Sequence, residues 1–336
     1  MALSELWFLL VAVLFIGFFF LEGFDFGVGM STRLVARSDL ERRMMINTIG
    51  PFWDANEVWL LTGGGAIFAA FPHWYATMFS GYYIPFVFVL LALIGRGVAF
   101  EFRGKVDHKN WTKVWDWVVF FGSVLPPFLF GVLFSSLLRG MPIDENMNLQ
   151  AGFYDYVNLY TVVGGITVTL ICYLHGLLFL TLKTLGDLQE RARLMAQKVI
   201  LATIASLVVF VGLSIVETDL FQFNSMATIP MVIGVVVAYA LAILFIAKKR
   251  DGFAFTMSGL GILLTVGSIF AGLFPRVMVS SISETYNLTV YNAASGAYSL
   301  KVMTIVALTL LPFVLGYQIW SYYVFRKRVD AKDLIY

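Results

Sequence analysis

Charged residues are scarce in this chain of 336 residues. Asp, Glu, Lys and Arg make up 13% of it, whereas hydrophobic residues make up 60%. Soluble globular domains carry about 25% charged residues. Apolar content at this level requires lipid as the surrounding solvent, so the composition excludes an ordinary soluble domain. The net charge of +2 also provides no large basic surface for nucleic acid.

Cysteine and histidine are scarce as well. Cys172 is the single cysteine, which excludes an internal disulfide. The three histidines are His73, His108 and His175, and no two of them have the spacing of metal ligands. The C-x-x-C-H pattern of haem attachment is missing too. We therefore predict no metal site in this chain, and we interpret His175 as a packing histidine with a hydrogen-bond partner.

Long apolar segments dominate the sequence. A membrane-spanning helix needs about 20 apolar residues. Nine segments approach this length, at about residues 6–30, 52–72, 77–99, 114–138, 157–182, 198–217, 228–247, 253–274 and 300–324. The connections between them are short. The sequence therefore predicts an all-α, polytopic membrane protein, with residues 1–336 forming one integral-membrane domain.

The basic residues are distributed unevenly between the loops. All but three of the 23 Lys and Arg residues fall in alternate loops or the tail, and this assignment places Arg96 in a loop. The exceptions are Arg139, Arg276 and Lys301. Basic residues are retained on the cytoplasmic side of a membrane. We therefore predict an amino terminus outside and a carboxyl terminus in the cytoplasm.

Two pairs of carboxyl groups lie within the apolar segments. Glu22 and Asp25 are three residues apart in the first segment, and Asp54 and Glu57 have the same spacing in the second. This spacing puts both members of a pair on one helix face. Ionisable groups at membrane depth are costly and are usually functional. We predict that these four acids form a proton pathway.

Structural explanations compete with this prediction for some acids. Asp54 and Glu57 follow Pro51 and could simply stabilise the positive end of a helix. Asp116 is interpreted as a helix-start residue of this kind, and Glu101 as an ion-pair partner of a nearby arginine, Arg96 or Arg103. Glu22 and Asp25 do not fit this explanation, because the helix dipole disfavours negative charge near a carboxyl end.

The sequence around these acids resembles subunit II of cytochrome bd-type quinol oxidases. The similarity extends over effectively the whole chain and is most specific in the first 130 residues. It is carried by Glu22–Met30, Glu41–Asn47, Pro51–Trp59, Gly63–Pro72, Phe79–Tyr83, Trp115–Trp117 and Gly122–Pro127, and it returns at Phe274–Pro275 and near Asn292–Lys301.

The resemblance implies a role within a larger enzyme. Subunit II pairs with a haem-bearing subunit I, sometimes with a small single-helix accessory subunit, in the bacterial cytoplasmic membrane. The complex oxidises quinol from the quinone pool in the lipid and reduces dioxygen to water without pumping protons. Haems b and d, the quinol site and the catalytic residues are expected in subunit I. Asp25 and Asp54 match the family's cytoplasmic proton pathway, and Glu22 stands where some members have Asp.

Two other functions are consistent with parts of the sequence. A cation-coupled secondary transporter could use the same four acids, although the paired helix interruptions typical of transporters are not evident. A purely structural membrane scaffold is the second alternative. Haem absorption that depends on a co-purifying partner would distinguish the oxidase subunit from both.

Overall fold

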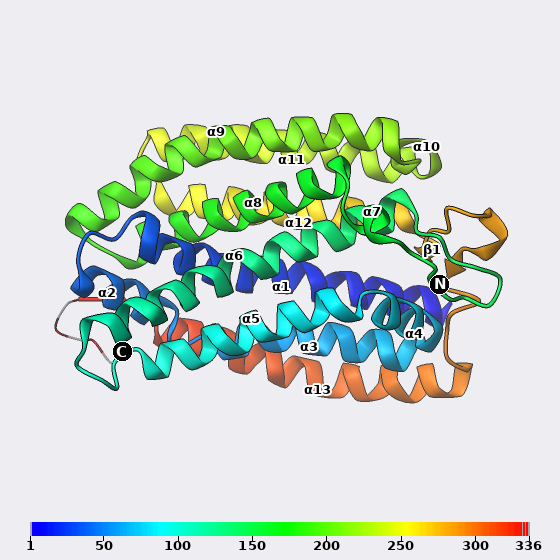
Figure 1. Cartoon of the computed structure of the whole chain (residues 1–336), viewed down its shortest axis with the longest axis horizontal. Coiled ribbons are helices and arrows are strands. Elements are labelled where there is room, and N and C mark those ends of the chain that lie inside the picture. The colour runs from blue at the N-terminus through cyan, green and yellow to red at the C-terminus, as the bar shows by residue number, and fades with distance from the viewer. Residues whose placement is uncertain (1, 331, 333, 335–336) are drawn as a thin grey trace.

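The computed structural model describes residues 2–330, 332 and 334. Long helices run alongside one another through most of the chain (Figure 1). They are α1 (Leu3–Leu34), α3 (Trp53–Ala70), α5 (Tyr83–Phe102), α6 (Lys109–Arg139), α8 (Leu159–Lys183), α9 (Gly186–Glu217), α11 (Ser225–Ala247), α12 (Asp251–Leu273) and α13 (Ala297–Val324). Shorter helices are α2 (Asp39–Ile49), α4 (Pro72–Gly81), α7 (Phe153–Tyr156) and α10 (Leu220–Phe223). Strands β1 (Arg276–Met278) and β2 (Leu288–Thr289) pair antiparallel around a 3-10 turn, Glu284–Tyr286.

Helix α1 lies at the centre of the bundle. It packs against α3, α6, α8 and α12, while α5 packs on α6 and α11 packs on α12. Figure 1 shows α9 and α11 along one edge of the bundle and α13 along the opposite edge. Polar side chains on α1 are therefore shielded from both lipid and water by several neighbouring helices.

Eight helices in the described residues are long and apolar enough to cross a membrane. The helix outside this set is α3, whose 18 residues include the polar side chains of Asp54, Asn56 and Glu57. The predicted membrane-embedded helical fold is confirmed. Nine crossings, and the sides on which the termini lie, stay predictions.

The nine predicted segments coincide with the long helices, although several bounds differ by a few residues and two segments differ more. The predicted segment 77–99 contains a break at Tyr82, where α4 ends and α5 begins. The predicted segment 198–217 begins late, because α9 starts at Gly186 and its first turns are polar. The amphipathic helix α2 was not predicted, since its apolar residues are too few to resemble a membrane span.

Two glycines allow α1 and α8 to approach closely. A Cβ atom built on Gly27 would lie 2.3 Å from the carbonyl oxygen of Cys172 and 2.7 Å from the Cα of Gly176. Real Cβ atoms do not approach so closely, so any larger residue at Gly27 would push the helices apart. Small residues have this role in many membrane helix pairs.

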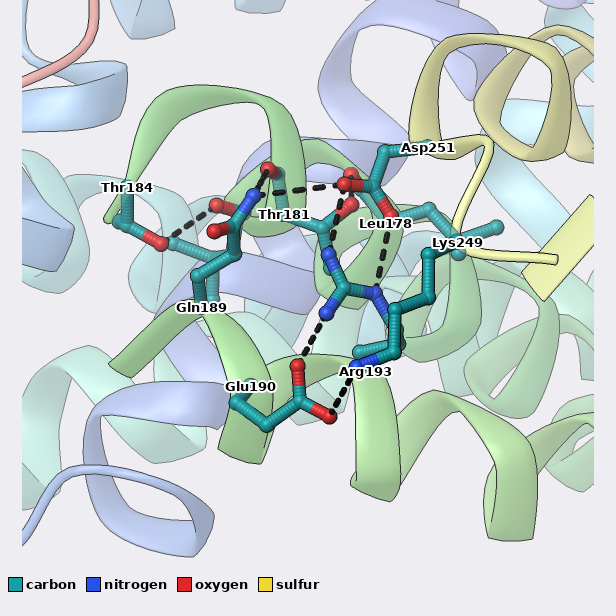
Figure 2. Close-up of polar contacts among 9 residues, drawn as sticks. Leu178, Thr181, Thr184, Gln189, Glu190, Arg193, Lys249 and Asp251 are labelled. Carbon is teal, nitrogen blue, oxygen red and sulfur yellow. Dashed lines mark hydrogen bonds and ion pairs between the residues drawn. The ribbon is translucent and has the colours of Figure 1, made fainter. Parts of the chain in front are cut away.

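A network of ion pairs and hydrogen bonds joins the ends of α8, α9 and α12 (Figure 2). Arg193 donates to both carboxylate oxygens of Asp251, at 3.1 and 2.8 Å, and also contacts Glu190. Gln189 donates to the Thr181 carbonyl at 2.8 Å. A bidentate guanidinium–carboxylate pair fixes geometry as well as charge. The network therefore holds the loops at this end of the bundle in register.

Helix α13 is attached to the bundle along one side only. Trp7 donates to Thr304 at 3.0 Å near one end of α13, and Trp59 donates to Gln318 at 3.0 Å further along. The rest of the helix is open: Leu300 is its one buried residue in the described structure. This attachment leaves a groove between α3 and α13.

Candidate functional site

Glu22 and Asp25 lie completely buried inside the bundle. Both side chains come from α1, and each residue has 0% exposure. Their spacing places them on the face of α1 that meets α3. A carboxyl group so far from water requires a partner of opposite charge, a hydrogen bond or a proton.

Arg96 of α5 is the positive partner in this site. It is also 0% exposed, and its Nη2 contacts Glu22 Oε1 and lies 2.6 Å from Glu57 Oε1. Its guanidinium lies 4.7 Å from the centre of the Phe26 ring. Glu22, Asp25, Glu57 and Arg96, which we call the carboxyl cluster, thus join three helices. The assignment of Arg96 to a loop was wrong, because α5 continues past it to Phe102.

Asp25 is connected to α13 through a second set of hydrogen bonds. The Asn56 amide donates to Asp25 Oδ2 at 2.7 Å. The Asn56 carbonyl oxygen in turn accepts from the Tyr322 hydroxyl at 2.8 Å and from Gln318 at 3.5 Å. Asn56 is itself buried. Sequence reasoning missed Asn56, Gln318 and Tyr322, because neutral side chains carry no charge pattern.

Asp54 stands apart from the cluster. Its side chain is exposed, and Oδ1 accepts from the backbone N–H of Ala55 at 2.8 Å within the first turn of α3. With Gln318 and Tyr322 it lines the α3–α13 groove, which has a volume of about 380 Å³. Of the four predicted acids the structure therefore brings three together and places Asp54 on the groove beside them.

Several polar atoms of the cluster have no protein partner. Within the described chain, Glu22 Oε2, Asp25 Oδ1, and Nε and Nη1 of Arg96 are buried and make no hydrogen bond. Buried polar groups are normally satisfied. The cluster therefore has spare donors and acceptors available for water or a proton.

His175 is engaged at both ring nitrogens. Nε2 lies 3.1 Å from the carbonyl oxygen of Phe20, and Nδ1 lies 3.1 Å from the Ser258 hydroxyl. A carbonyl only accepts, so Nε2 carries the hydrogen and Nδ1 accepts from Ser258. The ring also stacks on Phe255. The interpretation of His175 as a packing histidine is correct. The described residues contain no group of three or more His, Cys, Asp or Glu placed to hold a metal ion.

A second charged cluster lies toward the loops at the end of α5. Asp116 is buried and accepts from Arg103 Nε at 2.7 Å, with Arg42 at 3.6 Å, so it is more than a helix-start residue. Arg103 also contacts Asp39. Glu101 is exposed, and its predicted pairing with Arg96 or Arg103 is wrong, because other acids occupy both guanidinium groups.

Comparison with known proteins identifies the family of this chain. The model for cytochrome bd terminal oxidase subunit II matches residues 3–325. The chain belongs to this family. Cytochrome bd ubiquinol oxidase subunit 2 of Bacillus subtilis (strain 168) is 66% identical over 332 residues, which cover 99% of this chain and 98% of the relative. Cytochrome bd-I ubiquinol oxidase subunit 2 of Escherichia coli (strain K12) is 36% identical over 367 residues, with 99% and 96% covered.

The fold agrees with the family. A solved bd oxidase structure from Geobacillus thermodenitrificans superposes with a TM-score of 0.76 at 16% identity, covering 97% of this chain and 100% of that one. The predicted resemblance and the multi-pass location in a bacterial cytoplasmic membrane are confirmed. As a cytochrome bd subunit II, the chain is part of a terminal oxidase. This membership leaves the transporter hypothesis without support.

Proposed function

We propose that this cytochrome bd subunit II pairs with a haem-bearing subunit I and delivers cytoplasmic protons to the site of oxygen reduction there. In this proposal the α3–α13 groove collects protons, and the carboxyl cluster holds them inside the bundle. Quinol is oxidised and dioxygen is reduced to water by the complex. Protons used in water formation come from the inside, so the membrane is charged without a pump.

The observation that carries the proposal is the imbalance of charge around Arg96. Glu22 and Glu57 both contact the guanidinium, and the buried carboxyl group of Asp25 lies one helical turn from Glu22. Uncompensated buried charge costs several kcal/mol or more per ion. Each proton that a carboxyl group binds reduces the excess negative charge at a smaller cost. The cluster is therefore suited to bind a proton and to release it when a nearby site demands one.

The neighbouring polar side chains support a route from the groove to Asp25. Tyr322 and Gln318 line the groove and bond to Asn56, which bonds to Asp25. An amide does not readily exchange a proton in transit, so Asn56 orients Asp25 while water carries the proton. Asp54, exposed on the same groove, supplies a negative charge that attracts protons toward it.

The face formed by α3 and α13 is suited to a protein partner. At mid-helix it exposes Thr62 and Gly65 of α3, with Thr309 and Gly316 of α13. Small and hydroxyl-bearing residues favour close helix–helix packing in membranes. Large apolar side chains are exposed on α13 as well, including Leu308, Phe313 and Ile319, and these can pack against a partner's helices. Subunit I is therefore expected to dock against α3 and α13.

The haems are assigned to the partner. His175 has no ring nitrogen free for haem iron, because Phe20 and Ser258 occupy both. The described residues therefore do not fit an axial haem site built on this histidine. Haems b and d and a quinol site are expected in subunit I, with a small accessory subunit as a further prediction from the family resemblance.

Oxygen consumption per haem tests the proposal. Asp25→Asn removes the titratable group but keeps the bond from Asn56, so the complex is expected to assemble with normal haem content. Turnover should fall roughly 10²-fold, the scale of a lost proton-transfer group. Asp107→Asn, the same chemical change at an exposed loop position, is the control and should respire normally. Parental turnover of Asp25→Asn from acid to alkaline pH would show that protons enter elsewhere.

A further inference from the structure

A second groove lies where α8 and α13 end, next to the turn between α2 and α3. We call it the tail groove; its volume is about 350 Å³. Its cationic lining residues are Lys183, Lys327 and Arg328, and its apolar walls include Pro51, Phe52 and Val324. No Asp or Glu is among the described residues that line it. The lining therefore combines positive charge with apolar surface.

Lys183 is the buried part of this charge. The residue is 7% exposed, and its Nζ donates to the carbonyl oxygens of Phe325 and, at 3.1 Å, Lys327. The backbone N–H of Val329 donates to the Lys183 carbonyl at 2.8 Å, which closes residues 325–329 over the end of α8. Among the described residues no carboxylate forms an ion pair with Lys183. A buried ammonium without a counter-ion is costly, and an anion in the groove would relieve that cost.

Lys327 and Arg328 extend the positive charge to the surface. Both side chains are exposed, and neither forms a salt bridge within the described chain. They lie shortly after the end of α13 at Val324, where the apolar span gives way to water. Basic pockets between helices at this depth bind the phosphate groups of anionic lipids.

We propose that the tail groove binds the headgroup phosphate of an anionic phospholipid. Lys327 and Arg328 contact the phosphate, Lys183 supports it from below, and the apolar wall takes the glycerol and the first methylene groups. Free phosphate would satisfy the charges but would leave that wall against water. The inference is independent of the proton pathway, although the two sites share Phe52, whose ring stacks on Tyr322 at 4.3 Å.

Lipid binding to the delipidated chain, purified in its native assembly in neutral detergent, tests the proposal. The probes are phosphatidylglycerol and phosphatidylcholine with matched acyl chains, counted as bound molecules by native mass spectrometry. At least one phosphatidylglycerol should bind more tightly than phosphatidylcholine. Lys327→Gln with Arg328→Gln should weaken that binding roughly 30-fold, from the usual contribution of two basic residues near a lipid surface.

The matched control removes two exposed charges elsewhere. Lys105→Gln with Lys113→Gln changes the net charge equally and should retain the tight phosphatidylglycerol. Equal loss in both double variants would overturn the site, as would a wild-type chain that does not distinguish the two lipids. Inorganic phosphate that displaces the lipid at equal affinity would also overturn it, because the apolar wall would then contribute nothing. Thermal stability should match in all three proteins.

Discussion

Nη2 of Arg96 on α5 lies 2.6 Å from Oε1 of Glu57 on α3. The same nitrogen also contacts Oε1 of Glu22 on α1. One arginine therefore links three helices through two carboxylates, deep inside a membrane protein. Its position sets both the stability of the site and the number of protons that the site can hold.

Removing Arg96 should destabilise the protein strongly. Arg96→Gln leaves Glu22 buried without a positive partner, and breaking a buried ion pair in this way costs about 3–5 kcal/mol. Thermal unfolding of the purified complex, or its yield, measures the loss. Adding Glu22→Gln to Arg96→Gln should recover much of the stability, since the orphaned charge is removed. A double variant as unstable as Arg96→Gln would mean that Arg96 acts by packing alone.

Glu22 should tolerate a shorter carboxylate better than a neutral amide. Glu22→Asp keeps a titratable group near Arg96, whereas Glu22→Gln has none. We expect turnover to follow the order wild type, Glu22→Asp, Glu22→Gln, with about a tenfold or larger loss for the amide. Oxygen consumption per haem is the measurement. Equal turnover in the two variants would assign Glu22 a purely structural role.

Asp54 should affect the capture of protons more than assembly. Asp54→Asn keeps the hydrogen bond to the Ala55 N–H, so haem content should be normal. Turnover should fall about tenfold at neutral pH, because the negative charge of Asp54 raises the local concentration of protons at the α3–α13 groove. Lower pH should restore part of the rate by supplying protons directly. An unchanged rate at every pH would leave Asp54 as a helix-start residue.

Glu41 should contribute stability that disappears in acid. Burial alone would raise the pKa of Glu41, but the N–H of Arg37 at 2.6 Å and the guanidinium of Arg191 at 2.5 Å lower it below its ordinary value of 4.5. The folded state thus binds this proton less readily than the unfolded chain does. The contribution is complete above pH 4.5 and is lost as the pH falls through the lowered pKa.

Glu41→Gln measures that contribution. Its free energy of unfolding should be about 1 kcal/mol below that of the wild type at neutral pH, because the pair is partly exposed. The difference should shrink as the pH drops below 4.5. Glu101→Gln, at an exposed position outside any ion pair in the described structure, is the matched control. A difference that stays constant with pH would contradict the assignment.

The long helices could be predicted from sequence because each is an apolar run bounded by polar residues. Their ends were harder to predict where a helix continues into polar residues, as α9 does from Gly186. Helix α2 was missed because it is amphipathic and lacks a long apolar run. Its start is stabilised by the Ser38 side chain, which accepts a hydrogen bond from the Glu41 N–H. Hydropathy detects contact with lipid and is insensitive to such helices.

The site was predicted in part for a related reason. Glu22, Asp25 and Glu57 could be found because a charge in an apolar run is conspicuous. Arg96 lies at the end of such a run, where a single sequence does not distinguish a buried arginine from an interfacial one. Asn56 was invisible to charge patterns, although it makes the shortest link between Asp25 and α13. These partners depend on how helices meet, which is a property of three dimensions.

The contact between Gly27 and Gly176 has a consequence for how the site can respond. Asp25 lies two residues before Gly27, where the backbones of α1 and α8 are in contact, so α1 cannot move closer to α8 at this point. The backbone that carries the carboxyl groups is thus closely packed against α8. We expect gating of proton flow to come from side-chain rotation and from the filling and emptying of water positions, which are fast local events. A rate limited by these steps should be insensitive to the thickness of the surrounding bilayer.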